Sequence, residues 1–336
     1  MQYTKYAPVV IPTLNRFEHF KRCLESLEKC TGANKTEVYI ALDYPPSEKY
    51  IEGWKKIDEF LAEKEKNNGF GKLCVVRRER NYGIGNANDN FHTLLKEIKI
   101  NYECYITSED DNEFSPCFLE YMNACLQRFK DDDRILRICG YNFVTIEMPD
   151  MYKNNFYISK RFNAWGAGSW TRKNKVIESE YYSLDALRSI VLDDVKYNRL
   201  KELYPRGIRL IHSMLKLGKL HGDAINDIFA HLEDKYFILP TKSKVRNYGN
   251  DGTGIHSLRL NEAVHKRYSE QLIDTSCEFN FTNDIFSYEP VGIKVNDYVV
   301  KPSILSLCKS KYKSMICKFD IWLLRHFGFM PKSKYI

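Results

Sequence analysis

Three consecutive acidic residues, Glu109, Asp110 and Asp111, follow directly after the apolar run CYITS at 104–108. Their mutual repulsion is costly unless a cation or hydrogen-bond donors offset it. Hard divalent ions such as Mg²⁺ and Mn²⁺ bind carboxylate oxygens together with the phosphates of a substrate. The cluster is therefore a candidate site for a nucleotide diphosphate and a metal ion. The alternative is a solvated acidic turn.

Further candidate binding residues stand at or after the ends of the other short apolar runs, and most of them are polar. They are Pro12, Thr13, Asn15 and Arg16 after the first run, Asp43 after the second, and Arg78, Arg80 and Asn81 after the third. In an open parallel sheet, ligands bind outside the carboxyl ends of the strands, so we expect these residues to surround one ligand. The alternatives are a turn-capping role for Asp43, ahead of Pro45 and Pro46, and a surface role for the two arginines.

Four further positions could do chemistry in the second half of the chain. Trp165 and Gly166 form an aromatic turn that suits a sugar ring, because the sugar stacks on the indole and glycine lets the backbone approach. Asp223 opens a helical segment, where N-terminal capping is the alternative to a catalytic role. His256 lies in the glycine-rich stretch NYGNDGTGIHS, which is typical of a loop that closes over a ligand. The alternatives are a core tryptophan and a structural histidine.

Apolar runs alternate with segments of helical period, which predicts a parallel sheet flanked by helices. We expect strands at 7–13, 38–43, 73–78, 104–108 and 135–141, and helices near 116–130, 183–200, 206–218 and 223–236. The predicted organisation is one α/β domain over 1–260, with halves at 1–140 and 141–260, and a C-terminal extension over 261–336. Gly83 and Gly85 lack the third glycine of a dinucleotide fingerprint, and they follow the third strand rather than the first.

The extension carries the excess positive charge of the chain. Residues 301–336 hold eight Lys or Arg and one acid, Asp320, whereas the first 300 residues hold 43 charges of each sign. A general nucleic-acid-binding surface is therefore excluded. A basic amphipathic helix over about 303–330 is predicted, with one apolar stripe (Leu305, Cys308, Tyr312, Met315, Phe319, Trp322, Leu323 and His326). Such a helix lies on an anionic membrane surface or, alternatively, docks on the core of the protein.

Composition restricts where the protein works. The sequence has no run of about 18 apolar residues and no segment like a signal peptide, so we expect a cytoplasmic protein. Its ten cysteines are scattered without a CxxC pair, which indicates reduced, buried thiols rather than zinc or redox chemistry.

Taken in order, PTLNR, Asp43, RNYGIGNAN and EDD resemble the nucleotide-binding half of GT-A glycosyltransferases of the inverting family-2 type. The segments FNAWGAGSW, HGDAIND and KVRNYGNDGTGIHS are similar to acceptor-side motifs of bacterial polysaccharide and lipopolysaccharide glycosyltransferases. The resemblance covers residues 7–258. It implies the GT-A fold, a Rossmann-like α/β arrangement.

The resemblance also implies roles for single residues. Asp43 would contact the nucleotide base, Asp111 and His256 would bind Mn²⁺ or Mg²⁺, and Glu109 and Asp110 would contact ribose or the donor sugar. Asp223 would be the general base, with Asp227 as the alternative, because Asp223 has the better spacing to Pro240. Asn81 and Gly83 match an Asn-x-Gly motif, and Asn88 stands where the family often has an arginine, so Arg78 or Arg80 would supply the cation. EDD in place of DXD leaves open which acid binds the ion.

The implied activity is transfer of a sugar from a nucleotide diphosphate donor, in particular a UDP-sugar, to a hydroxyl of a lipid-linked bacterial surface glycan. Such an enzyme, of the hexosyl- or N-acetylhexosaminyltransferase class, would be peripheral on the inner face of the cell membrane. One alternative is an inactive glycan-binding or membrane-scaffold protein on the same fold. Another is a different nucleotide-using α/β transferase, which would be expected to carry a glycine-rich loop after the first strand, where this chain has PTLNRF.

Overall fold

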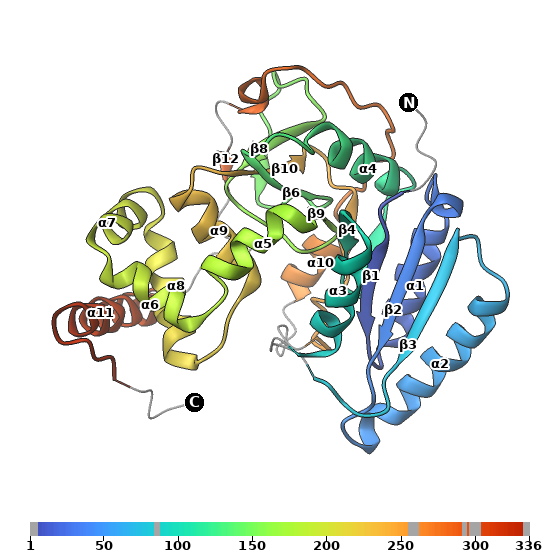
Figure 1. Ribbon diagram of the computed structural model, residues 1–336, viewed down its shortest axis with the longest axis horizontal. Coiled ribbons are helices and arrows are strands. Elements are labelled where there is room, and N and C mark those ends of the chain that lie inside the picture. The colour runs from blue at the N-terminus through green and yellow to red at the C-terminus, as the bar shows by residue number, and fades with distance from the viewer. Residues whose placement is uncertain (1–5, 84–87, 255–261, 291–293, 296–303, 332–336) are drawn as a thin grey trace.

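The computed structural model describes residues 6–83, 88–254, 262–290, 294–295 and 304–331. Its centre is an eight-stranded sheet with the order β3-β2-β1-β4-β9-β6-β10-β8 (Figure 1). The strands are β1 (Val9–Thr13), β2 (Glu37–Leu42), β3 (Lys72–Arg77), β4 (Cys104–Thr107), β6 (Ile135–Cys139), β8 (Phe156–Ser159), β9 (Ala167–Trp170) and β10 (Tyr236–Pro240). Strands β8 and β9 run antiparallel to their neighbours, and the other pairings are parallel. The sheet is therefore mostly parallel, as predicted.

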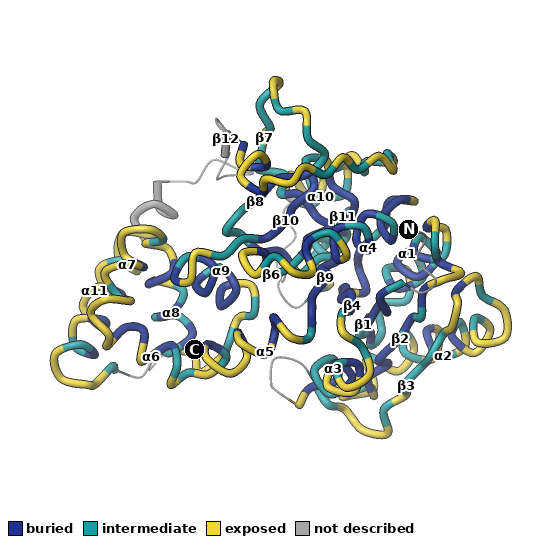
Figure 2. Tube along the Cα trace, turned by 45° about the horizontal axis from the view of Figure 1, so that its top comes forward, coloured by how far each residue is buried: buried dark blue, intermediate teal, exposed yellow. Residues whose placement is uncertain are grey.

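Helices cover both faces of the first four strands. Val9 and Ile11 of β1 belong to one core cluster, together with residues of α1 (Phe17–Glu28), α2 (Ile51–Lys66) and α4 (Phe118–Arg128). Val10 lies in another cluster, with α3 (Asn90–Asn101). Alternate residues of a strand point to opposite faces of the sheet, and a strand buried on both faces is therefore apolar throughout. The central strands are accordingly buried along most of their length (Figure 2).

A helical layer packs on the second half of the sheet. It contains α5 (Thr171–Glu180), α6 (Leu184–Leu192), α7 (Asp194–Leu203), α8 (Pro205–Leu217) and α9 (Gly222–Leu232), and α10 (Glu262–Ser269) follows later in the chain. The single helix predicted over 183–200 is wrong, because Asp193 ends α6 and its carboxylate accepts the N–H groups of Val195 and Lys196 at the start of α7. The helix predicted over 223–236 ends at Leu232, since β10 begins at Tyr236.

Two short ribbons complete the structure. Strand β5 (Asn112–Phe114) pairs with β11 (Val245–Asn247), and β7 (Ile146–Glu147) pairs with β12 (Lys294–Val295). The first ribbon matters for the site, because β5 directly continues the acidic cluster. It brings a segment from far along the sequence to the carboxyl end of β4.

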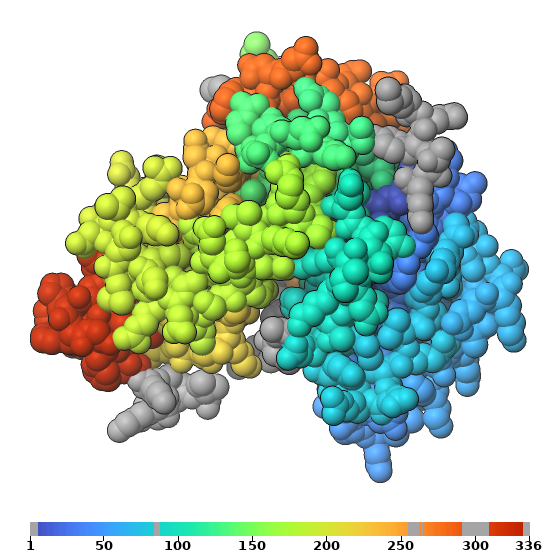
Figure 3. All heavy atoms as spheres, viewed as in Figure 1, coloured from blue at the N-terminus to red at the C-terminus, as the bar shows by residue number. Residues whose placement is uncertain are grey.

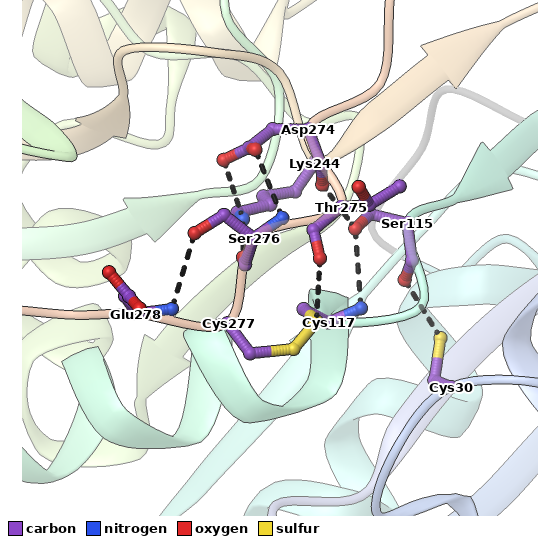
Figure 4. The surroundings of a disulfide bond; sticks show 9 residues. All are labelled: Cys30, Ser115, Cys117, Lys244, Asp274, Thr275, Ser276, Cys277 and Glu278. Carbon is purple, nitrogen blue, oxygen red and sulfur yellow. Dashed lines mark hydrogen bonds and ion pairs between the residues drawn. A yellow bond between two sulfur atoms is a disulfide. The ribbon is translucent and has the colours of Figure 1, made fainter.

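Residues 274–277, which we call the strap, lie across the start of α4 (Figure 4). The buried Lys244 ammonium donates to Asp274 Oδ2 at 2.8 Å, and the Ser115 hydroxyl donates to the Asp274 carbonyl at 2.5 Å. Cys277 forms a disulfide with Cys117, 160 residues away, with 5.3 Å between the Cα atoms. The prediction that every cysteine is reduced is wrong for this pair, because only the tertiary fold brings the two residues together.

The chain after the strap returns to the large core. Ile285 and Tyr288 are both buried there. The boundary at residue 260 stays a prediction, although packing continues across it.

The C-terminal helix α11 (Ile304–Phe327) is present, as predicted, and lies beside α6 and α8 at one end of the molecule (Figure 3). Cys317, Ile321 and Leu324 are buried against these helices. Asp320 accepts hydrogen bonds from His212 at 2.8 Å and from Lys216 at 2.5 Å. One face of the helix is thus docked on the protein. Among the described residues, no helix combines the length and the apolar character needed to cross a membrane.

Candidate functional site

Two adjacent carboxylates of the acidic cluster are held by one arginine. Arg16, just after β1, donates through Nη2 to Asp110 Oδ1 at 2.5 Å and to Asp111 Oδ2 at 2.8 Å. The Thr13 hydroxyl donates to the other oxygen of Asp110 at 3.0 Å. Parallel pairing of β1 with β4 explains why these residues meet, since both strands end at the same edge. The structure therefore brings together four of the predicted site residues.

The charges of this group are only partly balanced. Burial acts to lower the pKa of Arg16, but the charges of Asp110 and Asp111 outweigh it and raise the pKa. Burial also raises the pKa of Asp110, and this effect exceeds the opposing charge of Arg16. The short contacts of Arg16 with Asp110 and Asp111 are those of a charged guanidinium facing carboxylates. One cation cannot neutralise three acids.

Asn247 and Gly249 are site residues that sequence reasoning missed. The Asn247 amide donates to Asp111 Oδ1 at 2.7 Å and to Asn112 Oδ1 at 2.9 Å, across the β5–β11 ribbon. A Cβ atom at position 249 would lie 2.2 Å from Asp111 Oδ2, so only glycine fits there. The stretch NYGNDG marked a loop, but nothing in the sequence indicated that it returns to Asp111.

Asp43 is the acceptor for a whole turn. Its carboxylate accepts the backbone N–H groups of Tyr44, Tyr82 and Gly83 at 2.9, 2.9 and 3.0 Å, and the Asn81 side chain at 3.1 Å. Gly83 has φ +68°, a left-handed conformation that glycine adopts without strain. Desolvation raises the pKa of Asp43 in spite of these donors. The turn-capping alternative thus accounts for Asp43 in this structure. The contact of Asp43 with a nucleotide base stays a prediction.

The two predicted arginines lie near this turn. Arg78 Nε donates to Asn90 Oδ1 at 2.9 Å, and its guanidinium lies 4.9 Å from the centre of the Tyr82 ring. The Arg80 guanidinium is 5.4 Å from the same ring and exposed to solvent. Together they line an open hollow of about 560 Å³ beside the end of β3. Pro12, by contrast, lies within β1 opposite Ala41, and the carbonyl of Asn15 packs against Gly53.

One carboxylate of α9, that of Asp223, acts on the acidic cluster. The charge of Asp223 acts on Glu109: the pKa of Glu109 is raised first by desolvation, then by Asp111 and Asp223. Both side chains are nevertheless exposed to solvent, so water screens part of this repulsion. Two residues 114 positions apart in the sequence thus meet at one edge of the sheet.

Asp223 and Asp227 have different surroundings. Asp227 is tied into the fold, because it accepts the Phe162 N–H at 2.7 Å and the Tyr204 hydroxyl at 3.1 Å. Desolvation raises the pKa of Asp227 to about 7. Desolvation by the surrounding protein also raises the pKa of Asp223 to about 6, against the opposing effects of Arg137 and the Ala164 N–H, although the side chain is exposed. Of the two, Asp223 has the carboxylate that a ligand can reach.

Trp165 and Gly166 belong to an aromatic wall. The Trp165 ring lies edge-on to Tyr141, with 4.6 Å between the ring centres, and to Tyr268 at 5.7 Å. Gly166 has φ +69°, and a Cβ there would lie 2.9 Å from Phe118 and from Val245. Close packing explains the glycine, while the half-buried Trp165 borders a cavity.

The residues found at the acidic cluster do not fit the metal site predicted from the sequence. Asp111 is engaged by Arg16 and Asn247 on its two oxygens, so an ion there would have to displace one of them. His256 lies outside the described residues. Within the part of the chain that the structure describes, the one group of side chains with the spacing of a metal site is Cys117, Glu120 and Cys277, and its two cysteines are joined in the disulfide, which leaves no thiolate to bind an ion.

No protein-family model matches the chain, and no curated protein matches it in sequence. Some solved structures are similar. The mannosyltransferase PcManGT from Pyrobaculum calidifontis, in complex with GDP-Man and Mn²⁺, is 14% identical over 53% of this chain and 47% of its own, with a TM-score of 0.34. TarS residues 1–349 from S. aureus is 16% identical over 68% of this chain and 70% of its own, with a TM-score of 0.37. The chain thus spans about half the length of the first. Both likenesses are weak.

Proposed function

We propose that this protein is a glycosyltransferase that moves a sugar from a nucleotide diphosphate to an acceptor hydroxyl. The observation that carries the proposal is the meeting of the reachable Asp223 carboxylate with the acidic cluster at the carboxyl ends of β1 and β4. That edge of a parallel sheet is where nucleotides bind. Displacement at the anomeric carbon of the donor sugar needs a general base beside the site that binds the nucleotide.

In the proposed reaction, Asp223 accepts the proton of the acceptor hydroxyl. The acceptor oxygen then forms a bond to the anomeric carbon, while the bond from that carbon to the diphosphate oxygen breaks on the opposite face. A base with a pKa of about 6 is ionised near neutral pH and still accepts a proton as the oxygen attacks. Arg78 and Arg80, near the end of β3, offset the charge of the departing diphosphate. One displacement inverts the anomeric configuration.

A panel of nucleotide-sugar donors, which we call the donor panel, is the direct test of this proposal. The full chain is incubated with UDP-, GDP- and other nucleotide sugars, and released nucleoside diphosphate is measured. A UDP-hexose or UDP-N-acetylhexosamine is the expected donor, and a lipid-linked bacterial glycan is the expected acceptor, both from the family resemblance. Binding of a nucleotide sugar without any release would favour the inactive glycan-binding or scaffold protein instead.

The divalent ion stays a prediction of the resemblance. Mn²⁺ or Mg²⁺ would have to replace Arg16 or Asn247 at Asp111, or bind at the exposed Glu109. The donor panel run with EDTA and then with added Mn²⁺ decides this. Full activity in EDTA would mean that Arg16 is the permanent counter-cation and that no ion is needed.

We also propose that α11 holds the protein on an anionic membrane surface. The face opposite the docked one exposes large apolar side chains, with exposed fractions of 66% for Tyr312, 69% for Met315 and 59% for Phe319. Lys311 and Lys318 are exposed beside them. Aromatic groups at the acyl boundary with lysines at the headgroups are typical of an interfacial helix. Each basic residue near an anionic surface contributes about 1 kcal/mol.

Cosedimentation with vesicles tests the membrane proposal. The full chain should bind vesicles that contain phosphatidylglycerol and leave them at high salt. The variant Phe319→Ser with Trp322→Ser should bind less, whereas Leu192→Ser, at an exposed apolar residue of α6, is the matched control. A full chain that ignores anionic vesicles at low salt would contradict the proposal. In that case, the cell-membrane location predicted from the sequence loses its support.

A further inference from the structure

A cavity of about 280 Å³ lies next to the segment 161–165, and two arginines line it. We call it the arginine pocket; its lining includes Tyr141, Arg161, Asn163, Trp165, Arg206 and Tyr268. None of the described residues that line it is acidic. The pocket is therefore positively charged, with aromatic walls.

Among the described residues, the two guanidinium groups of the arginine pocket have no carboxylate in direct contact, although the charge of Arg161 also acts on Asp227. Arg161 lies 4.2 Å from the centre of the Phe143 ring, and Arg206 is exposed at the start of α8. In the described part of the chain, no ion pair involves Arg161 or Arg206. Arginine donors in pairs match the geometry of carboxylates and phosphates. Two such unpaired cations beside one cavity indicate an anionic ligand.

A buried hydroxyl in the same wall also lacks a partner. Tyr141 is 1% exposed, and its hydroxyl has no hydrogen bond of good geometry, although the backbone of Val144 lies near it. Leaving a buried polar group unpaired costs free energy, so such a group calls for an explanation. A ligand oxygen in the arginine pocket would supply the missing partner.

The segment 161–165 joins the arginine pocket to the candidate base. The backbone N–H groups of Phe162 and Ala164 face the carboxylates of Asp227 and Asp223, respectively. The alternate residues Arg161, Asn163 and Trp165 line the pocket. The pocket and the base therefore share one extended segment, which places the pocket on the acceptor side of the site.

We propose that the arginine pocket binds a negatively charged group, a carboxylate or a phosphate, carried by the acceptor glycan. This inference rests on the proposed function, since it assigns the acceptor of the same reaction. The sugar ring of the acceptor packs against Trp165 and Tyr268, and Arg161 and Arg206 hold the anion. A neutral glycan lacks the group that these arginines recognise.

Equilibrium binding to the full chain tests the proposal, with three small probes followed by ligand-observed NMR. Glucuronate carries a carboxylate, glucose 6-phosphate carries a phosphate, and glucose is the neutral match. The better-bound anion should exceed glucose by at least about tenfold, and that anion identifies the group. Equal binding of all three probes would overturn the proposal.

Variants test which residues of the arginine pocket produce the preference for an anion. Arg161→Gln and Arg206→Gln should each reduce the preference for the anion about tenfold. Tyr141→Phe should weaken anion binding without lowering the melting temperature, because it removes an unpaired hydroxyl. Arg172→Gln, at an exposed arginine paired with Asp133, is the control and should change nothing. Since Arg206 is exposed, its variant should fold even if Arg161→Gln does not. A retained preference in Arg206→Gln would contradict the assignment.

The donor panel separates this proposal from the proposed function. Nucleoside diphosphate release without any preference for anions would overturn the arginine pocket alone. Anion binding through the arginines in a chain that never consumes a nucleotide sugar would overturn the acceptor role, because there would then be no acceptor.

Discussion

The Asp110–Asp111 pair and Asp223 lie near the same edge of the sheet, and they differ in burial and in hydrogen-bond partners. Asp110 and Asp111 are buried and held by Arg16, Thr13 and Asn247. Asp223 is exposed at the start of α9 and has a pKa of about 6. The pair is built into the scaffold, while Asp223 is free to exchange a proton. Similar residues thus have different roles because their partners differ.

The largest expected effect is the loss of Arg16. Arg16→Gln leaves two buried carboxylates without their cation, which should lower the free energy of unfolding by about 3–5 kcal/mol. Urea denaturation measures this. Arg77→Gln is the control, because Arg77 also bridges two acids, Asp58 and Glu65, but at one-third exposure. There we expect a loss of about 1 kcal/mol or less. Equal losses in both variants would mean that burial adds nothing to the contacts of Arg16 with Asp110 and Asp111.

The next effect concerns turnover. Asp223→Asn should lower the rate of nucleoside diphosphate release in the presence of acceptor by roughly 10²-fold, the usual weight of a general base, with donor affinity unchanged. Asp227→Asn keeps one oxygen to accept the Phe162 N–H and should retain most of the rate. An inactive Asp227→Asn beside an unimpaired Asp223→Asn would assign the base to Asp227.

A smaller effect is expected on stability. The pKa values of Asp223 and Asp227 are raised in the folded protein, to about 6 and about 7, above the value near 4 of an unfolded chain. The folded state then binds more protons between these values, so these two groups should destabilise the fold progressively as the pH rises from about 4 to about 7. Melting temperatures across this range should show a shallower fall in Asp223→Asn than in the wild type. The same change of melting temperature with pH in both proteins would mean that Asp223 does not titrate in this range.

The first half of the sheet was predictable because its determinants are local. Apolar strands followed by polar residues indicate a parallel sheet and its ligand edge, and the meeting of Thr13, Arg16 and Asp110 follows from that topology. The link between Asp111, Asn247 and Gly249 was not predictable. It depends on a return of the chain over more than 130 residues, for which the sequence has no local signal.

In the second half of the chain too, the sequence did not predict features that depend on tertiary structure. Helical periodicity located α8 and α9 but gave no sign of the break at Asp193, where one side chain ends one helix and caps the next. The pairing of Cys117 with Cys277 also depends on tertiary structure alone. For α11, the sequence offered a docked face or a membrane face as alternatives. The helix has a buried face and a separate exposed apolar face, because its apolar residues lie on two sides.

The pH dependence of the single-turnover rate tests the central claim most directly, since it reports the protonation of the base itself. Wild-type protein, saturated with donor and acceptor, should lose its rate below an apparent pKa of about 6, because protonated Asp223 cannot accept the acceptor proton. The residual rate of Asp223→Asn should lack this acidic limb, while Asp227→Asn should keep it. An acidic limb that persists unchanged in Asp223→Asn would contradict the account.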